Sequence, residues 1–256
     1  ENTYITEGCQ TMTTTTHSWL ITGSASGIGA ATAAAATACG DEVLALDIDA
    51  QSGAQVARAC GAAFQQCDVS DPDHWRQVAD TFANRRPPDR IHLNAGVQIA
   101  PPNAPLAEYQ LQAMTLARYR RMMGVNVDGV VFGLHALLPV LEPGAAIVVT
   151  ASLAGITPYS IDPLYAMSKH AVVGLVRSLG PTLAERGIRI NALCPGGIDT
   201  NIIPDAQRTD EAVFMSPQCI AEEVLSLMQT EETGKSWAKV SEDKPAFIVR
   251  APGDRK

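Results

Sequence analysis

The sequence has no excess of basic residues, no paired cysteines and no long apolar run. Its 256 residues carry a net charge of −8, which argues against the basic surface that a nucleic-acid partner requires. Its six cysteines form no CxxC pair and have no histidine cluster near them, so we expect reduced thiols and no metal site. No apolar run reaches the ~20 residues that span a bilayer, and no secretory signal opens the chain. We therefore expect a cytoplasmic protein with no membrane partner.

The hydrophobic content of 46% is enough to bury a substantial core. Residues 1–11 are polar and aperiodic, and Met12 is typical of a native start, so we interpret 1–11 as a vector-derived or disordered extension. The remainder has no internal repeat and no linker. We predict that residues 12–256 form a single dinucleotide-binding catalytic domain.

Short apolar segments alternate with helical ones along most of the chain. This alternation predicts an α/β, Rossmann-type doubly wound parallel sheet. The expected strands are 18–21, 42–46, 63–67, 90–96, 145–150, 188–193 and 234–240. The expected helices are 30–39, 50–61, one capped by Ser70 that runs to about 86, 119–141, one through Tyr165 that ends at 186, and 217–229. We interpret 201–216 as a lid and leave 242–256 unassigned.

A glycine-rich turn joins the first expected strand to the first expected helix. Gly23 permits the tight turn, Gly27 lets the backbone approach a diphosphate, and Gly29 lets helix and strand pack closely. The free N–H groups of the helix N-terminus would then bind the anion. A glycine-rich turn without a ligand is the plainer alternative.

Asp47 ends the second expected strand, eighteen residues after Gly29, close to the offset of a carboxylate that binds ribose hydroxyls. A carboxylate there repels a 2′-phosphate, and no Arg or Lys lies between Trp19 and Arg58 to compensate it. We therefore predict NAD rather than NADP as the cofactor. Asp68 ends the next strand, either as a loop acid with no ligand or as a partner of the adenine amino group.

Two later strands also end in residues of interest. Asn94, Ala95 and Gly96 close the fourth strand, where small side chains would let a cofactor lie against the backbone. His92 within that strand is interpreted as a hydrogen-bonded core histidine. The strand 145–150 delivers Ser152 to its carboxyl end, where open α/β sheets bind ligands. Asn126 is unfavourable inside its helix, and solvent exposure is the ordinary explanation for such a residue.

Tyr165 and Lys169 are four residues apart, which places a phenol and an ammonium on one helix face. An unperturbed Tyr has a pKa near ~10, and a fixed positive charge favours the phenolate. The pair is therefore a candidate acid-base group with a pKa moved toward neutrality.

These motifs occur in one order, with Ser152 thirteen residues before Tyr165, and from about Trp19 to Val240 the chain resembles a compact, single-domain short-chain dehydrogenase/reductase. The resemblance implies a seven-stranded parallel sheet with helices on both faces and hydride transfer between an alcohol and a carbonyl. It implies that Tyr165 is the acid-base, that Lys169 lowers the Tyr165 pKa and holds the nicotinamide ribose, that Ser152 binds the substrate oxygen, and that Asn126 holds a relay water. The cofactor residues that the motifs and the resemblance together indicate are Gly23, Ser26, Gly27, Ile28, Gly29, Asp47, Asp68, Val69, Asn94, Ala95, Gly96, Tyr165, Lys169, Pro195, Gly196, Ile198 and Thr200.

The chain departs from the family pattern at three places. Leu93 stands where a second asparagine is common, the lid is short, and the last strand lacks the usual Asp-Gly-Gly ending. The tail is somewhat similar to that of the prostaglandin-dehydrogenase-like branch.

The expected substrate is a small-molecule, largely apolar secondary alcohol or ketone, bound without a charged clamp. The candidate pocket walls are Gln98, Leu153, Ala154, Tyr159, Ile161, Leu164, Gly197 and Ile202. Two alternatives stay open: an NADP-dependent ketoreductase, and a non-catalytic NAD-binding regulator on the same fold. The family also implies a homodimer or homotetramer.

Overall fold

The computed structural model describes residues 16–83 and 85–251. The expected extension at 1–11 lies outside these residues. Within them, an eight-stranded sheet has the order β3-β2-β1-β4-β5-β6-β7-β8. The strands are β1 Ser18–Thr22, β2 Glu42–Asp47, β3 Ala63–Gln66, β4 Arg90–Leu93, β5 Ala146–Thr150, β6 Arg189–Pro195, β7 Ser236–Lys239 and β8 Phe247–Ile248.

The first seven strands pair in parallel, as predicted, and β8 is an addition that the sequence analysis did not contain. β8 pairs antiparallel with β7 through Trp237–Ile248 and Ala238–Phe247. The side chain of Arg177 donates hydrogen bonds to Ser236 Oγ at 3.1 Å and to the Val249 carbonyl at 3.3 Å. The tail left unassigned therefore closes one edge of the sheet.

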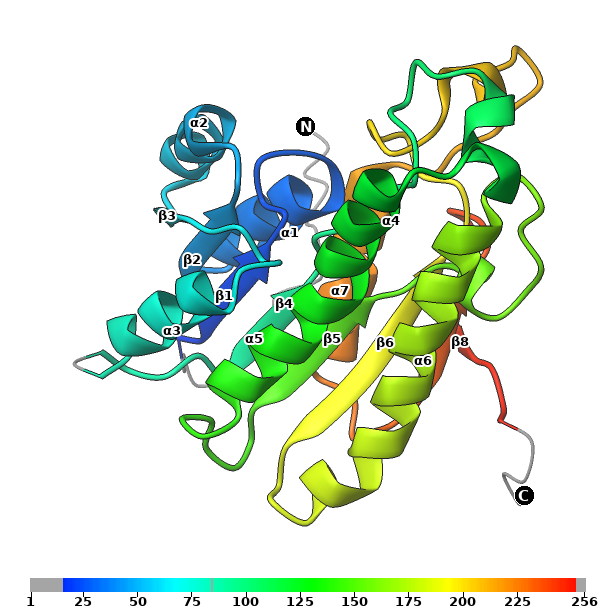
Figure 1. The fold of residues 1–256 in the computed structure, drawn as a ribbon. Helices are drawn as coiled ribbons and strands as arrows, with labels where there is room; N and C mark the ends of the chain where they lie inside the picture. Colours follow the sequence, from blue (N-terminus) through cyan, green and yellow to red (C-terminus); the bar gives the residue numbers. More distant parts are fainter. Residues whose placement is uncertain (1–15, 84, 252–256) are drawn as a thin grey trace, which may run out of the picture.

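Helices cover both faces of the sheet (Figure 1). The α-helices are α1 Gly27–Ala38, α2 Ala50–Cys60, α3 Pro72–Thr81, α4 Leu116–Met123, α5 Gly129–Leu137, α6 Pro163–Ala184 and α7 Pro217–Leu227. Helices α3, α5 and α6 lie in front of the sheet in Figure 1, and α1 and α7 lie behind it. The doubly wound architecture is thus the predicted one.

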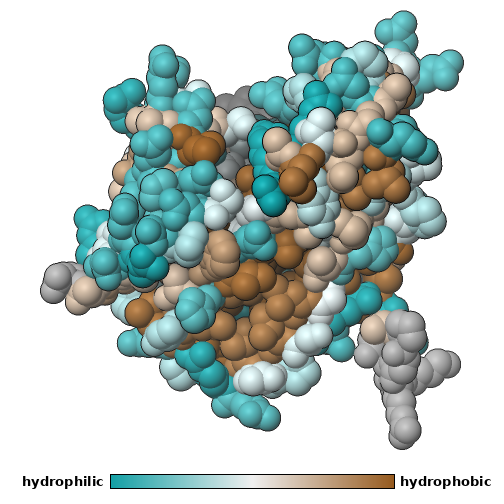
Figure 2. All heavy atoms as spheres, in the orientation of Figure 1, coloured by the Kyte–Doolittle hydropathy of each residue, from teal (hydrophilic) through white to brown (hydrophobic). Residues whose placement is uncertain are grey.

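The front layer also exposes apolar side chains. Figure 2 shows apolar atoms gathered over α5 and α6 on this face. Val131 on α5 and Met167 on α6 are both exposed. This surface is called the α5/α6 face below.

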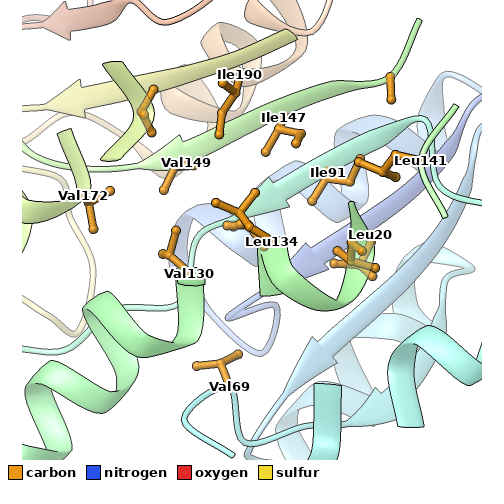
Figure 3. Close-up of a cluster of buried hydrophobic side chains, with 14 of the residues drawn as sticks. Leu20, Val69, Ile91, Val130, Leu134, Leu141, Ile147, Val149, Val172 and Ile190 are labelled. Carbon is orange, nitrogen blue, oxygen red and sulfur yellow. The ribbon is translucent and has the colours of Figure 1, made fainter. Parts of the chain in front are cut away.

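The two cores follow from the alternation of side chains along the strands. Leu20, Ile91 and Ile147 pack toward α5 and α6 (Figure 3), whereas Trp19 and Val148 pack toward α1 and α7. Because both faces are buried, the central strands have nearly continuous apolar sequences.

Three helix boundaries differ from the predictions. Helix α3 is capped by Asp71, whose side chain accepts the Asp73 N–H at 2.8 Å, and not by Ser70, and it ends at Thr81. Helix α6 was expected to end at 186 but ends at Ala184, and it begins at Pro163, where the Asp162 side chain caps it. The expected helix 119–141 is divided into α4 and α5 by a π-helical turn, Gly124–Asp128.

Candidate active site

All the parallel strands end at one edge of the sheet, and the strand order reverses between β1 and β4. This reversal is the position where open α/β sheets bind their ligands. Gly23 follows β1 there, and Asn94 follows β4. The Asn94 Nδ2 donates to the carbonyls of Thr22 and Gly23 at 3.2 and 3.3 Å, so the two strand ends are joined directly.

Tyr165 and Lys169 lie on one face of α6, as their spacing predicts. Both side chains are buried, and the Lys169 Nζ lies 5.7 Å from the centre of the Tyr165 ring. The same Nζ donates a hydrogen bond to the Thr150 carbonyl at 2.8 Å, at the end of β5. The ammonium is therefore fixed between α6 and the sheet edge.

Ser152 approaches the same phenol from β5. Its Oγ accepts the Ala154 N–H at 3.1 Å and so caps the short 3-10 turn Leu153–Gly155. Hydrogen bonding by Ser152 also acts on the hydroxyl of Tyr165, where it lowers the pKa. The structure thus brings Ser152, Tyr165 and Lys169 together.

Burial determines the protonation states of Tyr165 and Lys169. It raises the pKa of Tyr165 well above its ordinary value of 10.0, with smaller contributions in the same direction from Tyr159 and Asp162. It lowers the pKa of Lys169 to about 8. The expected shift of Tyr165 toward neutrality is therefore wrong for the protein by itself, because desolvation disfavours both charged forms.

Asn126 is buried, so the ordinary explanation from solvent exposure is wrong. Its Oδ1 accepts the Val97 N–H at 2.8 Å, and its Nδ2 donates to the Val97 carbonyl at 2.8 Å and to Ser168 Oγ at 3.0 Å. Ser168 in turn donates to the Tyr165 carbonyl at 2.7 Å. The π-helical turn thus carries an amide that joins the loop after β4 to α6.

The glycine turn has the conformation that the sequence predicts. Gly23 and Gly27 have φ of +66° and +52°, which other residues rarely adopt. A Cβ on Gly29 would overlap the Gly23 carbonyl, and one on Gly27 would lie 2.9 Å from the Thr200 methyl carbon. Ser26 caps α1 without a side-chain hydrogen bond, and no acid lies in the first turn. These uncapped N–H groups fit an anionic diphosphate.

Asp47 lies beside this turn. Its Oδ2 accepts the Ala25 N–H at 2.8 Å, and its Oδ1 accepts the Asp49 N–H at 2.9 Å. Ile48, which the sequence analysis did not select, exposes 62% of its surface next to Asp47. The only signal in the sequence is an apolar residue between Asp47 and Asp49, because the exposure of Ile48 is visible only in the structure.

Asp68 and Val69 follow β3. The Asp68 Oδ1 accepts hydrogen bonds from Ser70 N–H and Oγ at 2.9 and 2.7 Å, so the carboxylate also forms the turn before α3. Val69 is buried, and its carbonyl accepts from the Trp75 indole at 2.9 Å. Both readings of Asp68 remain compatible with this geometry.

The small residues after β4 and β6 line the same edge. A Cβ on Gly96 would lie 3.3 Å from Lys169 Nζ. After β6, Gly196 N–H pairs with the Lys239 carbonyl at 2.9 Å, Ile198 is buried, and Thr200 faces Gly27. A cavity of about 370 Å³ lies between α1, the segment after β6 and the start of α7. Its lining residues are Gly27, Ala30, Ala31, Ala34, Asp199, Thr200, Asn201, Pro217 and Gln218.

The lid predicted at 201–216 lies over Tyr165. Ile202 accepts a hydrogen bond from Gln98 Nε2 at 3.0 Å, and Gln207 Oε1 accepts one from the Tyr159 hydroxyl at 3.0 Å. The Tyr159 ring packs edge-on against Tyr165, with 6.2 Å between ring centres. Four of the expected pocket walls, namely Ala154, Tyr159, Leu164 and Ile202, belong to one apolar cluster with Tyr165.

Two buried polar residues, Asp162 and His92, lie near the site. The sequence analysis did not select Asp162, and it described His92 only as a core residue. Asp162 is fully buried and accepts N–H groups of both Tyr165 and Ile99. His92 bonds Thr150 Oγ1 at 2.8 Å through Nε2, but its Nδ1 has no partner among the described residues, so the interpretation of His92 as a hydrogen-bonded core residue holds for one nitrogen only.

Neither a metal centre nor a membrane span is found within 16–83 and 85–251. No group of three or more His, Cys, Asp or Glu side chains there could hold a metal ion. None of the helices in that part of the chain has the length and apolar character required to cross a membrane.

The sheet, the glycine turn and the polar cluster at the strand ends define a Rossmann-type, dinucleotide-binding fold. A family profile described as "Enoyl-(Acyl carrier protein) reductase" matches residues 23–248. The chain belongs to the short-chain dehydrogenase/reductase family and is an oxidoreductase. This family binds nicotinamide cofactors.

Three relatives and one solved structure illustrate the similarity. The chain is 36% identical over 197 residues to a 2,5-dichloro-2,5-cyclohexadiene-1,4-diol dehydrogenase of Sphingobium indicum, covering 75% of this chain and 76% of the relative. It is 33% identical over 240 residues to a cis-4-hydroxycyclohexanecarboxylate dehydrogenase of Sinomonas cyclohexanicum, covering 91% and 92%. It is 30% identical over 209 residues to the human 15-hydroxyprostaglandin dehydrogenase [NAD(+)], covering 75% and 71%. A blue fluorescent protein from a metagenomic library, solved with NADPH, has a TM-score of 0.76 at 30% identity, covering 87% and 95%.

Proposed function

We propose that the protein is an NAD-dependent oxidoreductase that transfers a hydride between a secondary alcohol or ketone and the nicotinamide. The observation that carries this proposal is the buried Tyr165 phenol, with Ser152 and the Lys169 ammonium beside it at the carboxyl edge of the sheet. The names of the diol and hydroxycyclohexane dehydrogenases support a compact alcohol as the substrate.

In this mechanism Ser152 holds the substrate oxygen and Tyr165 accepts the hydroxyl proton. The bound cofactor supplies the hydride acceptor at the carbinol carbon. Lys169 supports the phenolate by its charge, which offsets part of the desolvation at Tyr165. Asn126 keeps the loop after β4 in register with α6 and would hold a relay water behind Lys169.

The cofactor would lie along the edge where the strand order reverses. The α1 N-terminus with Ser26 and Ile28 would bind the diphosphate, and Asp47 the adenine ribose. Val69 and Asp68 would contact the adenine. Asn94 with Ala95 and Gly96, Lys169, and the segment from Pro195 through Ile198 to Thr200 would hold the nicotinamide riboside.

Replacement of the phenol tests the acid-base assignment. Tyr165→Phe should lower kcat by about 10²- to 10⁴-fold, because positioned proton transfer contributes that much. Tyr119→Phe, the same chemical change on α4, is the matched control. A loss of less than about tenfold in Tyr165→Phe would show that another group handles the proton.

Calorimetry with NAD and NADP tests the cofactor assignment. Asp47 bears a carboxylate where an NADP phosphate would lie, and Ser24, where a basic residue would help, is buried and donates to the Leu46 carbonyl at 3.1 Å. NAD should therefore bind more tightly. Tighter binding of NADP would overturn the Asp47 argument and favour the NADP-dependent alternative.

We also propose a homodimer or homotetramer. The α5/α6 face supports this proposal, since its exposed apolar side chains resemble those of surfaces that pack against a partner (Figure 2).

A further inference from the structure

Gln98 carries a buried hydrogen-bond acceptor with no partner. The residue lies in the loop after β4, is 5% exposed, and its Oε1 makes no hydrogen bond. Within 16–83 and 85–251, only three other buried side-chain nitrogen or oxygen atoms lack a partner: His92 Nδ1, Trp237 Nε1 and Ser241 Oγ. Since burying an unpaired acceptor costs stability, Oε1 calls for a ligand or a water as its partner.

The orientation of the Gln98 amide is fixed by the lid. Its Nε2 donates to the Ile202 carbonyl at 3.0 Å, and that carbonyl can only accept. Turning the amide over would place Oε1 against another oxygen. The observed orientation is therefore the stable one, and it leaves Oε1 as the unpaired atom.

None of the described residues is bonded to this acceptor. The Tyr159 hydroxyl has one proton, which it donates to Gln207 Oε1 at 3.0 Å. The two carboxylate oxygens of Asp162 are acceptors themselves and already bind backbone N–H groups. Ile99, Ala154 and Leu164 around Tyr165 are apolar, and the Tyr109 hydroxyl in the same cluster donates to the Pro101 carbonyl at 2.7 Å.

Gln98 is separated from the reacting phenol by one aromatic ring. Tyr159 packs edge-on against Tyr165. Burial raises the pKa of Tyr159, and hydrogen bonding by Gln207 and then by the Gln98 amide opposes this rise, so the amide lies beside the Tyr159 hydroxyl. A substrate whose reacting oxygen is bonded to Tyr165 would therefore place its opposite end near Tyr159 and Gln98. A donor on that opposite end is what Oε1 lacks.

We propose that Gln98 is a specificity-determining residue that accepts a hydrogen bond from a second hydroxyl of the substrate. The preferred substrates are then compact cyclic diols, with the second hydroxyl across the ring from the one that is oxidised. This inference rests on the proposed function. One relative, whose name specifies a cyclohexadiene-1,4-diol, supports the same class.

The test compares cyclohexane-1,4-diol with cyclohexanol under NAD reduction. The measured quantity is the ratio of kcat/KM for the diol to kcat/KM for the mono-alcohol, after correction for the two equivalent hydroxyls of the diol. One hydrogen bond predicts a ratio of roughly ten in the parent protein. Gln98→Met, which keeps the side-chain length but has no amide, should bring the ratio close to one.

Gln110→Met is the matched control. It removes the hydrogen bonds from the Gln110 amide to the Ser160 and Ile161 carbonyls but leaves Gln98, Tyr159 and Gln207 in place, so the ratio should stay near that of the parent. A ratio that is unchanged in Gln98→Met, or that falls equally in Gln110→Met, would overturn the assignment. Turnover of cyclohexanol without preference for the diol would overturn only the role of Gln98. Absence of turnover with both alcohols would instead overturn the proposed substrate class together with Gln98.

Discussion

Asp162 is expected to stabilise the junction between α6 and the loop after β4, because both of its carboxylate oxygens accept a backbone N–H. Oδ1 accepts the Tyr165 N–H at 2.8 Å and caps α6, while Oδ2 accepts the Ile99 N–H at 3.0 Å from the loop after β4. An asparagine has one carbonyl oxygen and could satisfy only one of these donors. Its NH₂ group would face the other N–H, so Asp162→Asn should separate the start of α6 from that loop.

The magnitude follows from the lost bond and the removed charge. A hydrogen bond to a charged group contributes about 1.5–3 kcal/mol, and a stranded buried N–H adds to the loss. Burial raises the pKa of Asp162, so the carboxylate charge is itself costly and the neutral amide recovers part of the loss. We expect a net decrease of about 1–2 kcal/mol in the free energy of unfolding. For a domain of this size that lowers Tm by roughly 2 to 8 °C.

Thermal unfolding at one protein concentration measures this effect, with Asp49→Asn as control. Asp49 also caps a helix with two hydrogen bonds, to Gln51 N–H and Ser52 N–H, but both use its Oδ1. An asparagine can keep both, so Asp49→Asn should leave the melting temperature unchanged. Equal effects of the two substitutions would refute the argument from the second oxygen.

Two further predictions concern pH and the glycine turn. Burial lowers the pKa of His92 from 6.5 to about 3, so below pH 6.5 the unfolded chain binds a proton that the folded protein refuses, and stability falls as the pH drops. At pH 4.5 this loss of folding free energy should be about 3 kcal/mol. Urea unfolding at pH 7 and pH 4.5 measures it, and the free energy of unfolding should decrease less in His92→Gln than in the parent protein. Equal decreases in the two proteins would contradict the assignment to His92. Gly27→Ala would require an unfavourable φ of +52° and would place a Cβ 2.9 Å from Thr200. NAD binding, measured by calorimetry, should therefore weaken roughly tenfold or more. Gly174→Ala is the control, because a Cβ there meets nothing within 4 Å and should leave NAD binding unchanged.

The parallel sheet was predictable because β1, β2 and β5 are short, largely apolar runs and because strands and helices alternate along the chain, which also placed the more polar β3. The antiparallel strand β8 was not, since it is two residues long and its pairing depends on Trp237 and on hydrogen bonds from Arg177, distant in sequence. The break between α4 and α5 was missed for a related reason. Helix propensity marks Asn126 as unusual, but only its contact with Val97 accounts for a buried amide in a π-helical turn.

The candidate site likewise contains some residues that the sequence predicts and others that only the structure identifies. Tyr165, Lys169 and the glycines are defined by local spacing, and the structure brings them together where that spacing predicts. The sequence analysis listed Gln98 only as a candidate pocket wall and did not select Asp162, and no local pattern predicts the long-range hydrogen bond of either residue. Their partners Ile99 and Ile202 lie 63 and 104 residues away in the sequence, so only the folded chain reveals that one uses two oxygens and the other leaves one unused.

Spacing also predicts distance better than it predicts protonation. The four-residue interval places the Lys169 ammonium 5.7 Å from the centre of the Tyr165 ring, yet the fold that brings them together also removes both from water. Desolvation raises the pKa of Tyr165 and lowers that of Lys169 to about 8, so each group resists the charge that the pair would need. In the proposed mechanism Lys169 would support the phenolate only while it is protonated, so this support would be lost as the pH rises through the Lys169 pKa. Tyr165 as the proposed proton acceptor would then require further positive charge or hydrogen bonding at the sheet edge, and hydrogen bonding by Ser152 already opposes the rise in the Tyr165 pKa that burial causes.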